Sequence, residues 1–300
     1  MALFGSYRSN HFVIQQLTRR AVLSRYRGTA LGLVWSLLTP MLMLAIYTFV
    51  FGLVLEIRWP VQEGGQAQFA AILFSGMILH SLLSDCLIQS TTLISDNPQY
   101  VKKVVFPLEA LPWVTVLSAL FQAAISLTVL VLYLVGLYLF GEDHVFGWSV
   151  IFLALPFLML SIVCLGIGWF VSAAAVYFRD ISQLMGVIST VLFFMAPILY
   201  PKSALPESIQ FLLYLNPITF PIEQLRNFLL WNTAPDIVGI GIYTAVALVF
   251  AYFGFVWFEK PAGSRATGAL ASLGLPSLPI DLDVGCADPT RFYPRTETAE

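Results

Sequence analysis

Residues 28–55 read GTALGLVWSLLTPMLMLAIYTFVFGLVL, a stretch without a charged side chain between Arg27 and Glu56. A transmembrane helix needs about 20 apolar residues to cross a hydrocarbon core about 30 Å thick, so this stretch is long enough. The residues before it include five arginines and no Asp or Glu. Such a basic flank is typical of the cytosolic side of a membrane. We therefore predict a membrane protein whose chain enters the bilayer from the cytosol.

The composition supports this prediction and argues against several other classes of protein. Hydrophobic residues make up 58% of the 300-residue chain and charged residues 11%, whereas soluble domains average about 45–50% and about 25%. The net charge of −2 gives no general attraction to nucleic acid. The three cysteines and the three histidines are scattered along the chain. We therefore predict neither a disulfide framework nor a metal site.

The apolar residues fall into six segments, from which we predict an all-α integral membrane protein with six transmembrane helices. No Lys or Arg lies inside a segment, and most lie on the side that this layout makes cytosolic, as the positive-inside rule requires. Because the number of spans is even, both termini lie in the cytosol. The predicted spans are residues 31–55, 69–93, 111–140, 148–176, 184–200 and 237–258.

Three further segments do not read as spans. Residues 9–26 predict an amphipathic helix along the inner interface. Gly28 and Gly32 then serve either to turn the chain sharply into the first span or to bring helices into close contact. Residues 203–231 hold short apolar pieces divided by prolines, which predicts a re-entrant or interface-lying helical hairpin on the outer side. The predicted domains are a cytosolic amino terminus, a transmembrane domain and a flexible cytosolic tail, at residues 1–30, 31–260 and 261–300.

Motifs of soluble catalysis are missing from the sequence. It contains no G-x-x-x-x-G-K-[ST], H-E-x-x-H or G-x-S-x-G, so a conduit, or part of one, is favoured over an enzyme. A membrane-bound glycosyl- or acyltransferase would need interfacial catalytic residues that the sequence does not show. A proton-coupled secondary transporter would use Asp85, the acid well inside a predicted span. Otherwise Asp85 lines the polar side of a channel or is a paired structural carboxylate.

The loop between the second and third predicted spans is a candidate contact for a soluble partner. It reads DNPQYVKKVVFP from residue 96 to 107, and Asn97-Pro98 is a good helix start. A short rigid helix here would transmit movement into the bundle. The alternative is a tight turn with two lysines that set the topology. The residues predicted to couple to a partner are Asn97, Pro98, Gln99, Tyr100, Lys102 and Lys103.

Five motifs in order resemble ABC-2 type permeases that export polysaccharides. They are RYRGTALGLVWSLLTP from residue 25, the 97–107 loop, YFRD from residue 177, APILYP from residue 196 and YLNP from residue 214. The likeness covers about residues 10–260. It is greatest to O-antigen exporter permeases of the Wzm type, with capsule and teichoic-acid permeases as near relatives. The tail beyond Lys260 departs from the pattern.

The resemblance implies an assembly in the bacterial inner membrane. Two copies of this chain would work with two copies of a separate ATPase subunit, which would use ATP and Mg, while this chain itself holds no cofactor. The substrate would be a polysaccharide on undecaprenyl diphosphate, moved outward between the two permeases among membrane lipids. A small-molecule ABC-2 exporter is the alternative within the family.

The resemblance also suggests roles for charged residues on the inner side. Arg20, Arg25 and Arg27 lie where a lipid pyrophosphate would arrive, and guanidinium groups suit phosphate oxygens. Their alternative role is to set the topology and contact lipid headgroups. Arg179 and Asp180 either contact the ATPase or form a local ion pair at the cytosolic mouth.

Other residues are candidates for the channel and its outer end. Aromatic faces suit a sliding glycan, although packing or lipid contact is the alternative for each ring; the candidates are Tyr47, Phe51, Phe194 and Tyr200. Glu223 and Arg226 are one helical turn apart. They either brace the outer hairpin, together with Asn216 and Pro217, or are solvated surface charges.

Overall fold

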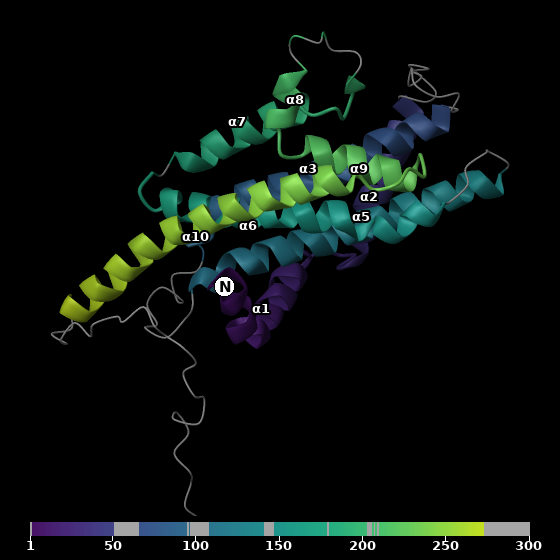
Figure 1. The fold of residues 1–300 in the computed structure, drawn as a ribbon. Coiled ribbons are helices and arrows are strands. Elements are labelled where there is room, and N and C mark those ends of the chain that lie inside the picture. Colours follow the sequence, from purple (N-terminus) through teal and green to yellow (C-terminus); the bar gives the residue numbers. More distant parts are fainter. Residues whose placement is uncertain are drawn as a thin grey trace, which may run out of the picture. The chain divides into compact units, whose positions relative to one another are not determined.

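The computed structural model describes residues 2–50, 66–94, 96, 108–140, 147–178, 180–202, 206, 208 and 210–272. Every regular element within these ranges is helical (Figure 1). The chain divides into two compact units, Met1–Ala262 and Gly263–Glu300. All the predicted site residues belong to the first unit.

Four helical segments of the described chain are long and apolar enough to cross a membrane. They correspond to four of the six predicted spans and confirm that the chain is a multi-pass membrane protein. Two of them begin with a short 3-10 helix, η2 (Leu108–Ala110) or η3 (Trp148–Phe152). The main helices are α3 (Gln66–Thr92), α5 (Leu111–Leu139), α6 (Ala154–Ala175) and α10 (Ile237–Ser272).

The other two predicted spans are shorter apolar helices. They are α2 (Val34–Tyr47), whose helical hydrogen bonding continues to Val50, and α7 (Ile181–Phe194). The fourteen residues of α7 extend about 21 Å at 1.5 Å per residue, less than a hydrocarbon core. It ends before Pro197, because proline disfavours helical backbone at the residue that precedes it. Residues 51–55 of the first predicted span lie outside the described residues.

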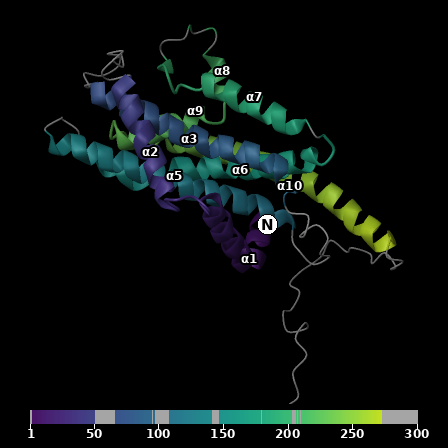
Figure 2. The same ribbon diagram turned by 180° about the vertical axis from the view of Figure 1, so that it is seen from behind.

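Helix α3 lies at the centre of the bundle. It contacts α2, α5, α6, α7 and α9 (Thr219–Leu229), and Figure 2 shows it between α7 and α5. Large side chains fill the interior around it. Trp169 of α6 is fully buried, packs edge-on against Phe255 and donates a hydrogen bond from Nε1 to the Glu109 carbonyl oxygen at 3.2 Å. Within the described residues, the bundle around α3 is therefore closely packed.

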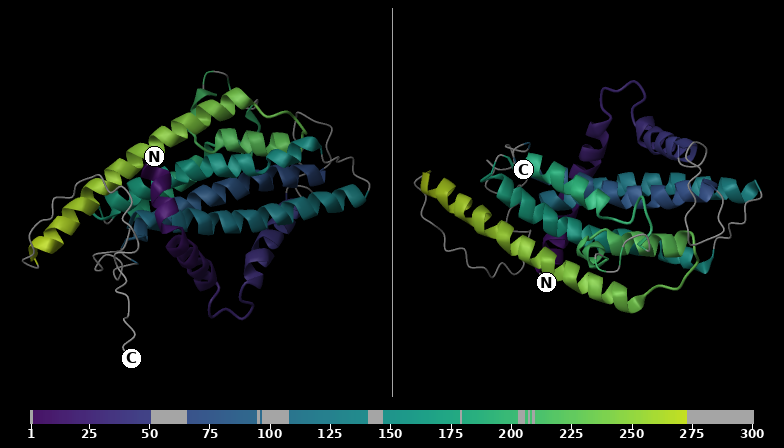
Figure 3. Two further views of the ribbon diagram at one scale, coloured as in Figure 1. Left: turned by 60° about the horizontal axis from the view of Figure 1, so that its bottom comes forward. Right: turned by 90° about the horizontal axis from the view of Figure 1, so that it is seen from above.

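Helix α1 (Ala2–Arg25) runs outside the main bundle, at the position predicted for an interface helix. Ile14 is fully buried against Ala110 and Val114, which fixes the middle of α1 to η2 and α5. The chain then turns sharply into α2, so that the two helices form a V (Figure 3). Gly28 and Gly32 in this turn have φ values of +88° and +53°, a region that glycine adopts without strain. No described atom lies within 4 Å of either Cβ position, so within the described residues these glycines serve the turn, and a role in close contact with another helix stays a prediction.

The predicted hairpin contains α8 (Phe211–Leu215) and α9, joined at Asn216 and Pro217. Asn216 accepts a hydrogen bond from the Ile218 amide at 3.1 Å and donates from Nδ2 to the Leu192 carbonyl oxygen at 2.7 Å. Most of α9 is buried, and it packs on α3, α6 and η3. The second half of the hairpin is therefore part of the bundle core and does not lie along its surface.

The end of α10 differs from the prediction. The last span was expected to end near residue 258, and the apolar part of the helix does end at Glu259, but the helix itself continues to Ser272, where a flexible tail was expected. The residues after Pro261 include several alanines and no further proline before residue 276, a composition compatible with helix. Residues 273–300 lie outside the described residues.

Candidate ligand entrance at the end of α1

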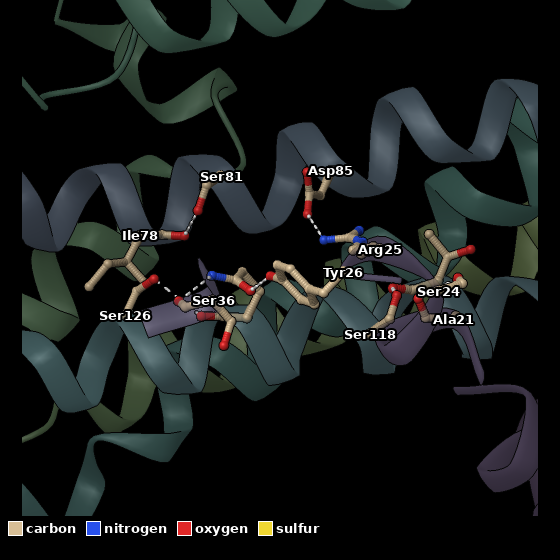
Figure 4. A network of polar contacts seen from close by, with 12 residues as sticks. Ala21, Ser24, Arg25, Tyr26, Ser36, Ile78, Ser81, Asp85, Ser118 and Ser126 are labelled. Atoms are coloured by element: carbon tan, nitrogen blue, oxygen red, sulfur yellow. Dashed lines mark hydrogen bonds and ion pairs between the residues drawn. The ribbon is translucent and has the colours of Figure 1, made fainter. Parts of the chain in front are cut away.

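An ion pair joins the end of α1 to the middle bundle helix. Arg25, the last residue of α1, donates a hydrogen bond from Nη1 to Asp85 Oδ2 of α3 at 3.1 Å (Figure 4). The two side chains are 31% and 39% exposed, so the pair is open to solvent. Asp85 is therefore a paired carboxylate, which is one of the roles that the sequence suggested for it. The sequence did not identify Arg25 as its partner.

A second polar connection secures the turn that follows α1. The Tyr26 hydroxyl donates to Gln122 Oε1 of α5 at 2.7 Å, and Gln122 Nε2 donates to the Ser36 carbonyl oxygen of α2 at 3.2 Å (Figure 4). Burial raises the pKa of the Tyr26 phenol, and Asp85 adds to this effect while Arg25 opposes it. The phenol therefore stays neutral at physiological pH and keeps its donor. This contact ties α1, α2 and α5 together at one point.

Two hollows adjoin the end of α1, and arginines line both. The first recess has a volume of about 430 Å³ and lies between α1, α3 and α5; its lining includes Arg20, Ser24, Arg25, Gln89, Thr115 and Ser118. The second recess has a volume of about 770 Å³ and lies beside the start of α2; its lining includes Arg19, Arg20, Tyr26, Arg27 and Gly32. Arg20 lines both. The structure thus brings the three predicted pyrophosphate-binding arginines to two neighbouring hollows.

The chemistry of the recesses suits a phosphorylated ligand. Guanidinium groups present planar sets of N–H donors that match phosphate oxygens, and charge-assisted hydrogen bonds of this kind are stronger than neutral ones. Hydroxyl and amide side chains supply further donors around the first recess. Among the described residues, no group of three or more His, Cys, Asp or Glu side chains could hold a metal ion.

A different kind of polar site surrounds Arg226 on α9. Its side chain is buried, with 2% of its surface exposed. Nη1 donates to the Pro197 carbonyl oxygen at 2.7 Å, Nε and Nη2 donate to the Ile72 carbonyl oxygen at 3.2 and 3.0 Å, and Nη2 also donates to that of Ile198 at 3.3 Å. Arg226 is thus an internal anchor and not a solvated surface charge. Glu223, one turn earlier, is partly buried, and burial raises the pKa of its carboxyl.

Comparison with known protein families agrees with the fold and the motifs. A family model described as ABC-2 type transporter matches residues 13–230, from α1 to the residue after α9. The chain belongs to this family. The resemblance indicated by the sequence motifs is therefore confirmed, and the chain is a permease subunit whose ATP hydrolysis is carried out by a separate partner.

Three relatives of this ABC-2 permease cover most of its length. O-antigen export system permease proteins RfbA from Myxococcus xanthus and Klebsiella pneumoniae are 26% and 24% identical to it over 246 residues, which is 81% of this chain and 90% of theirs. The polysialic acid transport protein KpsM from Escherichia coli is 21% identical over 247 residues, 82% of this chain and 92% of its own.

The predicted coupling residues of this permease are mostly outside the part of the chain that the structure describes. This applies to Arg179 and to the loop residues Asn97, Pro98, Gln99, Tyr100, Lys102 and Lys103. Asp180 is described and precedes α7, where its backbone carbonyl accepts hydrogen bonds from the Gln183 and Leu184 amides at 3.1 and 3.2 Å. The roles of all these residues in partner contact stay predictions.

The predicted channel aromatics take different positions in the permease. Tyr47 of α2 is half-buried, with its ring centroid 6.3 Å from that of Phe74 on α3. Phe194, at the end of α7, is 59% exposed, and its carbonyl oxygen accepts a hydrogen bond from the Tyr200 hydroxyl at 2.6 Å. Phe51 lies outside the described residues. Both rings therefore have a packing contact, Tyr47 with Phe74 and Phe194 with Phe193 at a centroid distance of 5.1 Å.

Proposed function

We propose that this permease is the transmembrane subunit of an ATP-driven exporter of lipid-linked polysaccharide, with O-antigen on undecaprenyl diphosphate as its substrate. One observation carries the proposal: several arginines line two hollows beside an otherwise apolar helix bundle. A lipid-linked glycan carries its diphosphate between an apolar chain and a polar polymer, so a basic site next to spanning helices matches it. The printed names of the relatives, O-antigen export permeases, support the same substrate class.

The proposed topology has six membrane crossings with both termini in the cytosol. Helices α2 and α7 supply the two crossings beyond the four long helices. On this arrangement α1 lies along the inner interface and α8 and α9 form a re-entrant hairpin from the outer side. The burial of α9 supports this form of the hairpin, because protein shields its irregular backbone.

The proposed assembly is a homodimer with two ATPase subunits, located in the bacterial inner membrane. The packed interior around α3 and Trp169 supports two copies, because a polysaccharide needs a passage that one filled bundle does not offer. The passage then lies between the two permeases, with Asp85, Phe194 and Tyr200 as candidates for its lining. ATP and Mg bind to the ATPase, and its conformational change is transmitted to the permease through the 97–107 loop and α1.

Capsular polysaccharide is the second candidate substrate. It is favoured by the relatives named polysialic acid transport protein, which align over nearly the same length of chain. The entrance at α1 would serve a polymer of either kind if it is carried on a phosphorylated lipid.

Reconstitution tests the proposed function. The permease and its ATPase are placed in vesicles with undecaprenyl-diphosphate-linked glycan, and a lectin added outside detects exported polymer. We expect export that requires ATP and both subunits. Export by the permease alone, abolished by Asp85→Asn, would instead establish a proton-coupled transporter. A reconstituted pair that exports small amphiphiles but no glycan would place the chain with small-molecule exporters.

A further inference from the structure

The Arg25–Asp85 ion pair occupies the same arginine that a diphosphate would need. Arg25 lines the first recess, yet its guanidinium already contacts a carboxylate oxygen at 3.1 Å. Both side chains are about one-third exposed, at 31% and 39%, and ion pairs this open to solvent are weak. The pair is therefore strong enough to orient Arg25 and weak enough to exchange.

We propose that Asp85 is a built-in competitor that holds Arg25 while the first recess is empty and releases it to the diphosphate of an arriving lipid. This inference rests on the proposed function of the recess. A diphosphate has more negative charge and more acceptor oxygens than one carboxylate, and Arg20 lines the same recess. A ligand that bridges both guanidinium groups displaces Asp85, because multiple charge-assisted hydrogen bonds outweigh a single exposed ion pair.

The competition gives the recess selectivity. A neutral lipid headgroup offers no charge to replace Asp85, so Arg25 stays paired and the recess stays closed to it. A ligand with a single carboxylate would replace the Asp85 carboxylate by an equivalent group. Its binding would therefore gain little free energy from Arg25. Asp85 therefore acts through Arg25 as a specificity residue that favours phosphorylated lipids over others of similar length.

The exchange also changes how α1 is attached to the bundle. In the paired state Arg25 links α1 to α3, while Tyr26 links the same end of the chain to α5. Diphosphate binding removes the first link and leaves the second intact. Occupancy of the recess is therefore transmitted to α3, the central helix, as the release of its carboxylate.

A binding experiment tests the competition directly. The full-length permease is purified in detergent, and its affinity for farnesyl diphosphate is measured by calorimetry. We expect Asp85→Asn to bind about two- to fivefold more tightly than wild type, the range that an exposed ion pair supplies. Arg25→Ala should bind more weakly than wild type, and adding Asp85→Asn to it should restore nothing. A gain in affinity cannot arise from misfolding, which makes the result specific.

Asp96→Asn is the matched control, because Asp96 lines the same recess and the substitution removes the same charge without touching the pair. Its affinity gain should be smaller than that of Asp85→Asn. Equal gains in affinity would show that any nearby negative charge weakens diphosphate binding, and would overturn the competition. Farnesol should bind all variants alike.

The failures of the two proposals can be told apart. If wild type binds farnesyl diphosphate and Asp85→Asn binds it with the same affinity, the competition is overturned. Glycan export in vesicles can still succeed in that case. Export that fails although Asp85→Asn tightens binding overturns the proposed function alone. No binding by any variant removes the diphosphate site and the competition together.

Discussion

Arg25 and Arg226 show two uses of one side chain in the same permease. Arg25 ends an outlying helix, is partly exposed and has an aspartate partner. Arg226 is buried in the bundle and donates to three backbone carbonyl groups. The first arrangement can exchange its partner for a ligand, whereas the second joins α3 to the irregular backbone that follows α7. Exposure and the kind of partner, a side-chain carboxylate or backbone carbonyl groups, separate a candidate binding site from a structural anchor.

The largest effect is expected from Arg226→Ala. The substitution leaves the carbonyl oxygens of Pro197 and Ile198 without this donor in a buried site, whereas that of Ile72 keeps the Ser75 hydroxyl, and each unsatisfied group costs about 1–3 kcal/mol. We expect a loss of about 3 kcal/mol or more in the free energy of unfolding, measured as a fall in melting temperature in detergent. Arg19→Ala is the exposed control and should melt like wild type. Similar melting of the two variants would contradict the anchor.

The next effect is on transport and concerns the other arginine. Arg25→Ala combined with Arg27→Ala removes charge-assisted hydrogen bonds worth about 1.5–3 kcal/mol each. Glycan export by the reconstituted complex should fall about tenfold or more, since 1.4 kcal/mol is a factor of ten, while melting changes little. Arg8→Ala removes an exposed arginine of α1 outside both recesses and should export normally. Equal losses with Arg8→Ala would point to general topology instead of a ligand site.

A smaller effect is predicted at Gly76, beside the buried arginine. An added Cβ would lie 3.2 Å from both Arg226 Nη2 and Ile198 Cγ1, and overpacking typically costs about 1–3 kcal/mol. Gly136 of α5 has no described atom within 4 Å of its Cβ position, so Gly136→Ala gains helix propensity without a clash. We expect Gly76→Ala to be less stable than Gly136→Ala by about 1–3 kcal/mol in thermal unfolding. Equal stability of the two variants would show that the side chains around Arg226 can shift to make room for the added methyl group.

The smallest effect is predicted for Tyr26→Phe. It removes the hydrogen bond to Gln122 at 2.7 Å and should lower the free energy of unfolding by about 0.5–1.5 kcal/mol. Tyr138→Phe, on an exposed part of α5, should be neutral in the same melting measurement. If both variants match wild type, the link between the turn and α5 contributes nothing measurable.

The sequence predicted the spans well because a long apolar run has few other uses. The helices α3, α5, α6 and α10 lie where the hydropathy placed them, and the turn glycines have the backbone angles that their type suggested. Hydropathy did not separate α9 from a surface helix, because the apolar face of a short helix does not show whether protein or membrane covers it. The run of apolar residues Phe228, Leu229 and Leu230 at its end was the available sign of burial.

The entrance was predicted only in part. Arginines at the end of an interface helix are visible in the sequence, so Arg20, Arg25 and Arg27 could be named. The pairing of Arg25 with Asp85 could not, because sixty positions separate them and neither residue has a local motif that identifies the other. The same holds for Tyr26 and Gln122. Such contacts depend on how helices pack, which periodicity within one helix does not reveal.

The two unhindered glycines between α1 and α2 have a mechanical consequence. Their left-handed φ angles set the bend, and no described side chain is wedged into it. The angle between α1 and α2 is therefore set by the backbone torsion angles of the turn. A hinge of this kind can change that angle without disturbing side-chain packing within the turn. Because Ile14 anchors the middle of α1 to η2 and α5, any change in the hinge angle has to be matched by movement at that contact.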